Sequence, residues 1–181
     1  MSLTTEDGTG KADAESYATV AFSDTYFSNR GKTTWAAFTT AQKESYLRLS
    51  TDFIEQRYRM YWDGYKKYST QALSWPRTFV YGEPVLYGDS NLPYPQLISS
   101  TIVPTEVKNA CAELALKAST YTDGLLPDVT DLITEETIGP ITTKYDKLSP
   151  ASPQYKAIDA MLAVYLKDGG INSATSTVQR A

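Results

Sequence analysis

Histidine is absent from the sequence of 181 residues, and this absence excludes much of enzyme chemistry. Histidine is the most common general base near neutral pH and the most common zinc ligand. The chain also lacks the glycine-rich phosphate-binding motifs, the G-x-S-x-G nucleophile motif and any Cys-x-x-Cys pair. We therefore predict that the protein is not an enzyme and that it holds no cofactor and no metal ion.

Cysteine is nearly absent, and long apolar runs are missing. The single cysteine, Cys111, excludes a disulfide scaffold, and its place on the apolar side of a predicted helix indicates a buried thiol in a reducing compartment. No apolar run approaches the roughly 18 residues of a membrane span, and the first residues lack the basic start and apolar run of a secretory signal. We expect a soluble protein that is made in the cytoplasm and does not contact a membrane.

The composition, with 41% hydrophobic and 21% charged residues, is that of an ordinary globular domain. Apolar residues spaced three and four apart predict a mainly α fold, a small bundle of about four main helices. We expect one helical domain at residues 1–168, with an irregular connector and a β-leaning arm, and an extended tail at 169–181. The predicted helices cover residues 16–30, 39–62, 104–122 and 152–168.

Capping signals support these helix starts. Ser16 can accept a hydrogen bond from a first-turn amide, and Thr39 with Gln42 resembles a capping box. Pro104 suits a first helical turn, and Ser152-Pro153 reads as a cap followed by a proline at the first helical position. The predicted inner stripe of the second helix consists of Tyr46, Leu47, Phe53, Ile54 and Tyr58, and its outer face carries Arg48, Glu55, Gln56 and Arg59.

The connector at 65–103 has no regular period and is rich in proline, glycine and aromatic residues, so we expect at most short strands in it. Loops of this length inside a compact domain are uncommon unless they are functional. Trp75, held outside a helix by Pro76, is predicted to anchor the connector on helix 104–122, with Arg77 free to reach an acidic partner. The predicted contacts with a neighbouring chain are Phe79, Val80, Tyr81 and Tyr87.

A second irregular region, at 125–148, favours an extended arm or a hairpin. Its stretches VTDLI and ITTKY are rich in β-branched residues and are separated by a Gly-Pro step. An extended arm can add a strand to another chain, which satisfies its open backbone groups. We therefore expect Ile138, Ile141 and Tyr145 to contact a neighbouring chain.

Charge is distributed unevenly around a net value of −4. A basic region at 43–77 and an acidic region at 123–146 suit head-to-tail contact between copies, although solvated faces are the simpler interpretation. Within the basic region, RYRMYWDGYKKY at 57–68 interleaves cations with aromatic rings, as single-stranded-DNA-binding surfaces do. The competing interpretation is a helix end whose aromatic residues pack inward. The possible DNA-facing residues are Arg57, Arg59, Lys66 and Lys67.

Several stretches, in order, carry a family resemblance: EDGTGKADAESYATVAFSDTYFSNRG, ALSWPR, VPTEVKNACAELALKA and TIGPITTKYD. Over nearly its whole length the chain resembles head-to-tail connector (adaptor) proteins of tailed bacteriophages, many of which are labelled DnaT-like single-stranded-DNA-binding proteins. The resemblance implies a helical domain, twelve copies of which form a ring under the portal, extend the DNA channel and receive the next neck, stopper or tail protein. It implies a virion protein that passes through the host cytoplasm, without catalytic residues.

The same resemblance implies that the C-terminal tail docks on the portal protein, through Ile171, Val178, Gln179 and Arg180. Two functions therefore follow from the sequence. The first is a structural adaptor whose partners are the portal, further copies of itself and possible channel DNA. The second is a single-stranded-DNA-binding module, which the acidic net charge disfavours.

Overall fold

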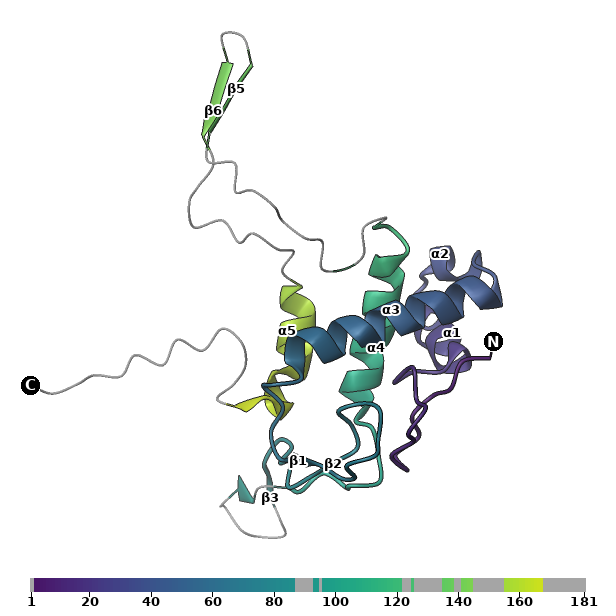
Figure 1. Cartoon of the computed structure of the whole chain (residues 1–181), viewed down its shortest axis with the longest axis vertical. Helices are drawn as coiled ribbons and strands as arrows, with labels where there is room; N and C mark the ends of the chain where they lie inside the picture. The colour runs from purple at the N-terminus through teal and green to yellow at the C-terminus, as the bar shows by residue number, and fades with distance from the viewer. Residues whose placement is uncertain are drawn as a thin grey trace, which may run out of the picture.

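The computed structural model describes residues 2–86, 93–94, 96–121, 125, 135–138, 141–144 and 155–167. Within them the fold is mainly helical, as predicted. Figure 1 shows α3 and α4 crossing, with α5 beside the C-terminal end of α3 and with α1 and α2 at its other end. None of the described helices combines the length and the apolar character that a membrane span requires. The helices are α1 (Val20–Ser28), α2 (Thr33–Ala36), α3 (Thr40–Tyr58), α4 (Thr105–Ala118), α5 (Lys156–Leu162) and the 3₁₀ turn η1 (Ala163–Tyr165).

The capping box of α3 is confirmed, whereas the predicted cap of α1 is wrong. Thr39 Oγ1 accepts a hydrogen bond from the amide of Gln42 at 3.4 Å, and Gln42 Oε1 accepts one from the amide of Thr39 at 2.9 Å. The cap of α1 is Thr19, whose hydroxyl accepts from the amide of Phe22 at 3.0 Å. Ser16 is buried instead, and its hydroxyl donates to a backbone carbonyl two residues on.

The last helix is shorter than predicted. α5 begins after Tyr155, later than predicted, and the cap predicted at Ser152-Pro153 lies outside the described residues. Tyr155 turns into the core, where its ring meets that of Phe53 with centroids 5.2 Å apart, and its non-helical backbone sets the later start. After Leu162 the chain tightens into η1, so the helix does not continue to residue 168.

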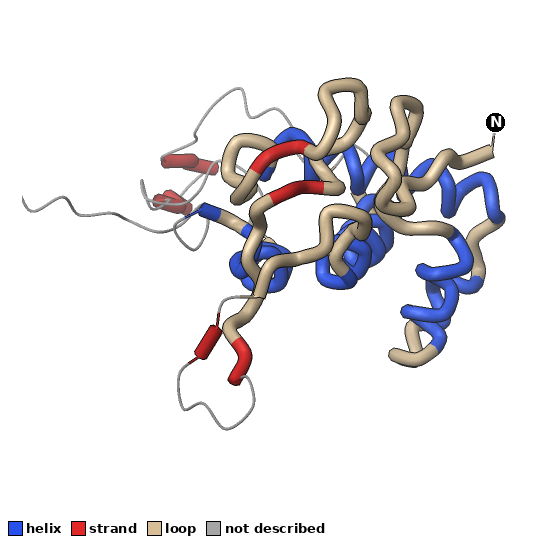
Figure 2. Tube along the Cα trace, turned by 90° about the horizontal axis from the view of Figure 1, so that it is seen from below, coloured by secondary structure: helices blue, strands red, loops and turns tan. Residues whose placement is uncertain are grey.

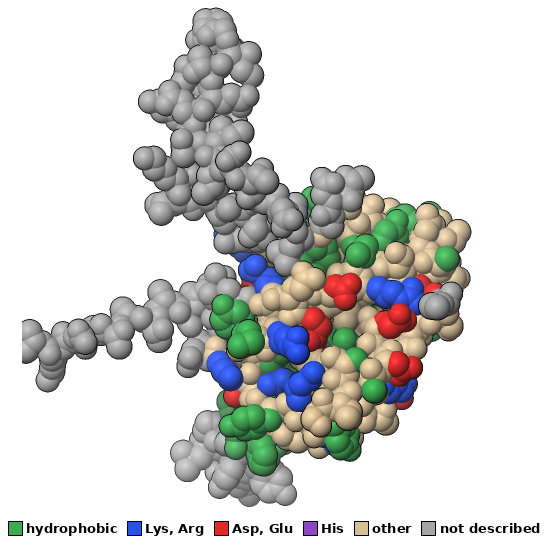
Figure 3. All heavy atoms as spheres, in the orientation of Figure 1, with side chains coloured by type: hydrophobic (Ala, Val, Ile, Leu, Met, Phe, Trp, Pro, Cys, Tyr) green, Lys and Arg blue, Asp and Glu red, His purple; other side chains and the backbone are tan. Residues whose placement is uncertain are grey.

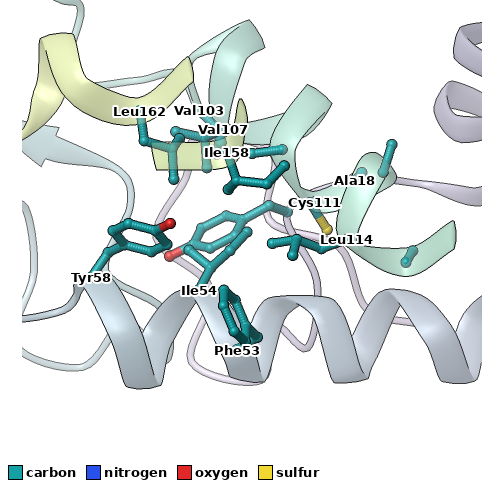
Figure 4. Packing of buried hydrophobic residues seen from close by; sticks show 14 of the residues in the cluster. Ala18, Phe53, Ile54, Tyr58, Val103, Val107, Cys111, Leu114, Ile158 and Leu162 are labelled. Atoms are coloured by element: carbon teal, nitrogen blue, oxygen red, sulfur yellow. The ribbon is translucent and has the colours of Figure 1, made fainter. Parts of the chain in front are cut away.

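The core lies where α4 packs between α3 and α5. Figure 4 shows Phe53, Ile54 and Tyr58 of α3 facing side chains of α4 and α5. Four alanines of α4 are buried in this layer: Ala110, Ala112, Ala115 and Ala118. The burial of Cys111 is confirmed, because its Sγ is fully enclosed and lies 3.1 Å from Ser50 Oγ. The partners of α3 in this layer are Val107, Cys111, Leu114, Ile158 and Leu162.

The strands are short, as expected for the connector, and all pair antiparallel in twos. Figure 2 shows those of the connector within a region made mostly of loops. The predicted arm or hairpin is confirmed as a hairpin, with Ile138 paired to Ile141 at its closed end. The strands are β1 (Tyr65–Lys66), β2 (Arg77–Thr78), β3 (Val85–Leu86), β4 (Pro93–Tyr94), β5 (Glu135–Ile138) and β6 (Ile141–Lys144).

Trp75 is fully buried, which is the environment that the core-anchor prediction requires. Its ring meets Trp62 and Tyr165 edge-to-face, each with centroids 5.6 Å apart, and the Trp75–Pro76 peptide bond is cis. The hydroxyl of Tyr165 donates to Glu106 of α4 at 2.6 Å. Trp75 is thus joined to α4 through Tyr165, in an aromatic cluster that also includes the end of α3.

Glu55 does not lie on an outer, solvated face of α3 as predicted. Its carboxylate accepts hydrogen bonds from the amide of Ser74 at 2.9 Å, from the hydroxyl of Ser74 at 2.7 Å and from the hydroxyl of Tyr17. Tyr17 is fully buried, and its hydroxyl oxygen accepts from the amide of Trp75 at 3.3 Å. We name Glu55, Tyr17 and Ser74 the connector clamp, because they join α3, the N-terminal segment and the connector.

The prediction that Arg77 is free to reach an acidic partner is wrong. Arg77 is buried, and its guanidinium donates to the carbonyl oxygens of Asp63 and Gly64 at 2.7 Å and of Ser74 at 3.2 Å. Burial lowers the pKa of Arg77, but nearby carboxylates oppose that change. A guanidinium presents several donors in one plane, so it satisfies carbonyls from two segments at once.

The N-terminal polar segment is ordered by a buried carboxylate. Glu6 is 1% exposed and accepts hydrogen bonds from the amides of Gly8, Gly10 and Lys11 at 2.8–2.9 Å. Gly8 has φ +102°, and a Cβ there would lie 1.9 Å from the carbonyl oxygen of Thr101. The EDGTGK stretch is therefore a packed loop that closes over the connector.

Candidate nucleic-acid interface

The segment 57–68 leaves the end of α3 and enters β1, and its four predicted DNA-facing residues separate into two groups. Arg57 is not available as predicted, because its guanidinium lies 3.4 Å from the carboxylate of Asp159 on α5 and both side chains are largely buried. The hydroxyl of Tyr58 donates to the same carboxylate at 2.6 Å. Arg57 therefore joins α3 to α5 and contributes to the fold.

Lys66 is also occupied by contacts within the chain. Its ammonium donates to the carbonyl oxygens of Gln71 at 3.2 Å and Ala72 at 3.5 Å. Partial burial lowers the pKa of Lys66, with nearby Arg59 and Arg77 adding to the effect. Its strand partner is the buried Arg77, so Lys66 lies on the inner face of the β1–β2 pair. The prediction that Lys66 faces DNA is therefore wrong.

Arg59 and Lys67 remain available for a phosphate. Arg59 is exposed, Lys67 is half-buried, and neither forms an ion pair with another described residue. The ammonium of Lys67 lies 5.1 Å from the ring centroid of Tyr68. Alternation along β1 places Tyr65 and Lys67 on the face opposite to Lys66.

Lys167 adds a third cation that the sequence pattern does not predict. The backbone of 165–167 pairs antiparallel with 61–63, since Lys167 donates its amide to the carbonyl of Tyr61 at 2.8 Å and Trp62 forms a bridge with Leu166. Lys167 is exposed. A residue one hundred positions away is thus brought beside Tyr61, and only the tertiary pairing reveals it.

The aromatic residues of the same segment divide by face. Tyr58 and Trp62 are buried, as the inward-packing interpretation requires, and burial together with Asp159 raises the pKa of Tyr58. Tyr61, Tyr65 and Tyr68 are exposed, Tyr65 to 71%. Neither interpretation of 57–68 is therefore complete, because one set of rings supports the core and the other faces solvent.

Phe79 extends the exposed set from the other strand. It follows β2 directly, and the β1–β2 register places it opposite Gly64, one residue from Tyr65. Figure 3 shows Lys and Arg side chains together with hydrophobic ones over the part of the molecule where α3 ends and β1 lies. We name this set the aromatic–basic surface: Arg59, Tyr61, Tyr65, Lys67, Tyr68, Phe79 and Lys167.

The chemistry of the aromatic–basic surface is that of binding. Exposed rings can stack on bases, and unpaired cations can contact phosphates. The described residues contain no group of three acidic, histidine or cysteine side chains that could hold a metal ion. The surface carries no titratable pair of the kind that acid–base catalysis uses.

The predicted neighbour contacts have different outcomes. Val80 is fully buried, so its assignment to a contact with another chain is wrong. Its carbonyl accepts from the amide of Ile98 at 2.8 Å, which joins two parts of the connector. Phe79 and Tyr81 are exposed. The side chains of Ile138 and Ile141, and all of Tyr87, Tyr145, Ile171, Val178, Gln179 and Arg180, lie outside what the structure describes.

The fold and this surface define a small, mainly helical protein with an exposed aromatic and basic face. The chain belongs to the family described as "Putative DnaT-like ssDNA binding protein", whose model matches residues 1–181. No curated protein and no solved structure matched the chain. The family therefore agrees with the label expected from the sequence, while the phage adaptor function stays a prediction.

Proposed function

We propose that the protein binds single-stranded DNA through the aromatic–basic surface. The observation that carries the proposal is the presence of exposed rings beside cations that have no acidic partner among the described residues. Stacking of one base on an aromatic side chain contributes about 1–3 kcal/mol and tolerates any sequence. The family description supports the same activity.

The acidic net charge of −4 limits the affinity, because the molecule as a whole repels phosphates. Binding therefore depends on the local cations Arg59, Lys67 and Lys167. Each phosphate contact to a single strand contributes about −0.7 to the slope of log affinity against log salt. Three contacts give a slope of about −2, a value that one titration series can measure.

Fluorescence anisotropy with a labelled oligothymidylate, repeated over a range of salt concentrations, tests the proposal. We expect a slope near −2 that becomes shallower by about 0.7 in Lys67→Ala and in Lys167→Ala. Lys32→Ala is the matched control, because it removes the same charge from an exposed position on the N-terminal side of α2. Absence of binding, or equal weakening by the control, would refute the proposal.

A second function, the head-to-tail adaptor, has an observation of its own. Tyr81 and Leu97 are exposed and form a β-bridge, and Val85 nearby in sequence is also exposed. Contiguous exposed apolar groups of this kind mark protein contacts. In this proposal these side chains meet a neighbouring copy in a ring of the virion neck, and the tail residues dock on the portal.

One experiment distinguishes the adaptor function from the DNA-binding function. Light scattering after gel filtration, with and without a purified portal ring, measures assembly. An adaptor binds the portal ring, and Leu97→Ser weakens that assembly while the salt slope for DNA stays unchanged. A protein that never binds a portal ring and never forms a ring on it excludes the adaptor function and leaves the DNA proposal untouched.

A further inference from the structure

Phe79 combines two features that oppose each other. Its φ is +59°. Among the described residues, Phe79 is the one residue with a positive φ that is not a glycine. This region is unfavourable for residues with a Cβ and is rare for a bulky side chain. Phe79 is nevertheless 67% exposed, so core packing does not compensate for the strain.

The surrounding backbone explains why a left-handed residue is needed here. Arg77 and Val80 are both buried, although an extended strand would place residues three apart on opposite faces. The positive φ of Phe79 shifts this alternation, which turns Val80 into the core and directs the ring of Phe79 outward. Glycine would adopt the same backbone without strain, so local folding does not require a phenyl ring.

Gly64 fixes the position of this turn. It has φ +61°, and a Cβ on it would lie 2.1 Å from the carbonyl oxygen of Thr78 and 3.0 Å from the carbonyl carbon of Phe79. The two backbones are therefore in direct contact. The backbone that carries the ring of Phe79 is packed against Gly64 and is not part of a loose loop.

From this geometry we infer that Phe79 is a base-stacking residue, which makes the aromatic–basic surface select unpaired nucleotides. The inference rests on the proposed function. Tyr65 lies one residue from Gly64 on the partner strand, and Lys67 lies on the same face as Tyr65. A base on Phe79 would thus have a second ring and a cation for the adjoining phosphate close by. Stacking needs an exposed base face, which a duplex does not offer.

Measurements of affinity for two oligonucleotides test this role. Anisotropy compares an oligothymidylate with an abasic oligonucleotide of equal length, which has the same phosphates and no bases, for the wild type and for Phe79→Ala. We expect the wild type to prefer thymidylate by about 5- to 150-fold, the range that stacking gives. Phe79→Ala loses most of this preference, and Phe79→Tyr retains it. Tyr121→Ala, another exposed aromatic residue, serves as the control and leaves the preference unchanged.

Stability provides an independent readout. Phe79→Gly also removes the ring but relieves the backbone strain, so it unfolds at the same or a higher temperature than the wild type and shows the same loss of preference. A clearly lower unfolding temperature would mean that the ring supports the fold, and would overturn the inference.

The measurements distinguish a failure of the proposed function from a failure of the role of Phe79. If the wild type binds neither oligonucleotide, the proposed function and the inference both fail. If it binds both equally, or if Phe79→Ala keeps the preference for thymidylate, the DNA-binding proposal stands and the role of Phe79 is refuted. A change of oligomeric state in Phe79→Ala with unchanged base preference would assign the ring to a protein contact instead.

Discussion

The connector clamp makes the sharpest prediction about stability. Glu55→Ala removes a carboxylate that accepts hydrogen bonds from the amide and the hydroxyl of Ser74 and from the hydroxyl of Tyr17. Tyr17 and Ser74 are buried, so water does not readily replace the lost acceptor. The variant therefore leaves buried donors without a partner where the connector meets α3.

The size of the effect follows from the groups left behind. The amide of Ser74 retains the hydroxyl oxygen of Tyr17 at 3.0 Å, which leaves two hydroxyl groups to compensate. A buried donor without a partner costs about 1–3 kcal/mol, and because Glu55 is half-buried we expect a total of about 2–4 kcal/mol. For a chain of this length the midpoint of thermal unfolding then falls by roughly 5–15 °C.

Chemical and thermal denaturation of the intact chain measure the loss. Gln56→Ala is the matched control, because it changes the next residue of α3 at an exposed position, and we expect it to alter stability by less than about 0.5 kcal/mol. Tyr17→Phe removes the same contact from the other side, so the double variant should lose less than the sum of the single ones. Equal stability of Glu55→Ala and Gln56→Ala would refute the clamp.

Four further predictions concern the same core. Burial, with Glu55, raises the pKa of Tyr17 well above 10, so Tyr17 contributes a loss of stability of about 1.4 kcal/mol per pH unit above pH 10 and none below it, in addition to the loss from Tyr58; denaturation at pH 9–11 measures the total fall, which Tyr17→Phe should make shallower by that amount. Gly64→Ala should lower stability by more than about 1 kcal/mol, because its Cβ would meet the carbonyl of Thr78; a denaturant midpoint equal to that of the wild type would contradict this. Arg77→Lys should lose about 2 kcal/mol in the same assay, because the three carbonyls are bound by three separate guanidinium nitrogens, whose positions a single ammonium nitrogen cannot all reach. Cys111 should react with a thiol reagent only after unfolding, and rapid labelling of the native protein would disprove its burial.

The features that the sequence predicted well are local. The capping box of Thr39 and Gln42 depends on residues three positions apart, and the inner stripe of α3 depends on helical spacing alone. The capping box and the stripe are both present in the structure, because tertiary contacts stabilise the same conformation. The burial of Cys111 could be predicted for the same reason, since its neighbours on α4 share one apolar side.

The features that it missed depend on contacts between distant segments. Glu55 and Arg77 look like surface charges by spacing, but each meets backbone groups of the connector, which no periodicity encodes. Val80 was assigned to a contact surface because it lies between aromatic residues. The positive φ of Phe79 turns it inward, and φ is invisible in a sequence that has no glycine at that position. The order of the EDGTGK stretch likewise depends on the buried carboxylate of Glu6.

The basic and aromatic segment at the end of α3 contributes some residues to the core and others to the surface. Tyr58 and Trp62 are four residues apart and point into the core, and their tilted rings lie 5.9 Å apart. Because the helix ends at Tyr58 and the chain then joins β1, Tyr61 and Tyr65 are left on the outside beside Lys167 and Lys67. The DNA proposal uses this exposed edge, but an exposed aromatic ring can also contact another chain, so loss of a ring alone does not tell the two proposed functions apart. The dependence on salt does, since phosphate contacts release counterions and apolar contacts between copies do not.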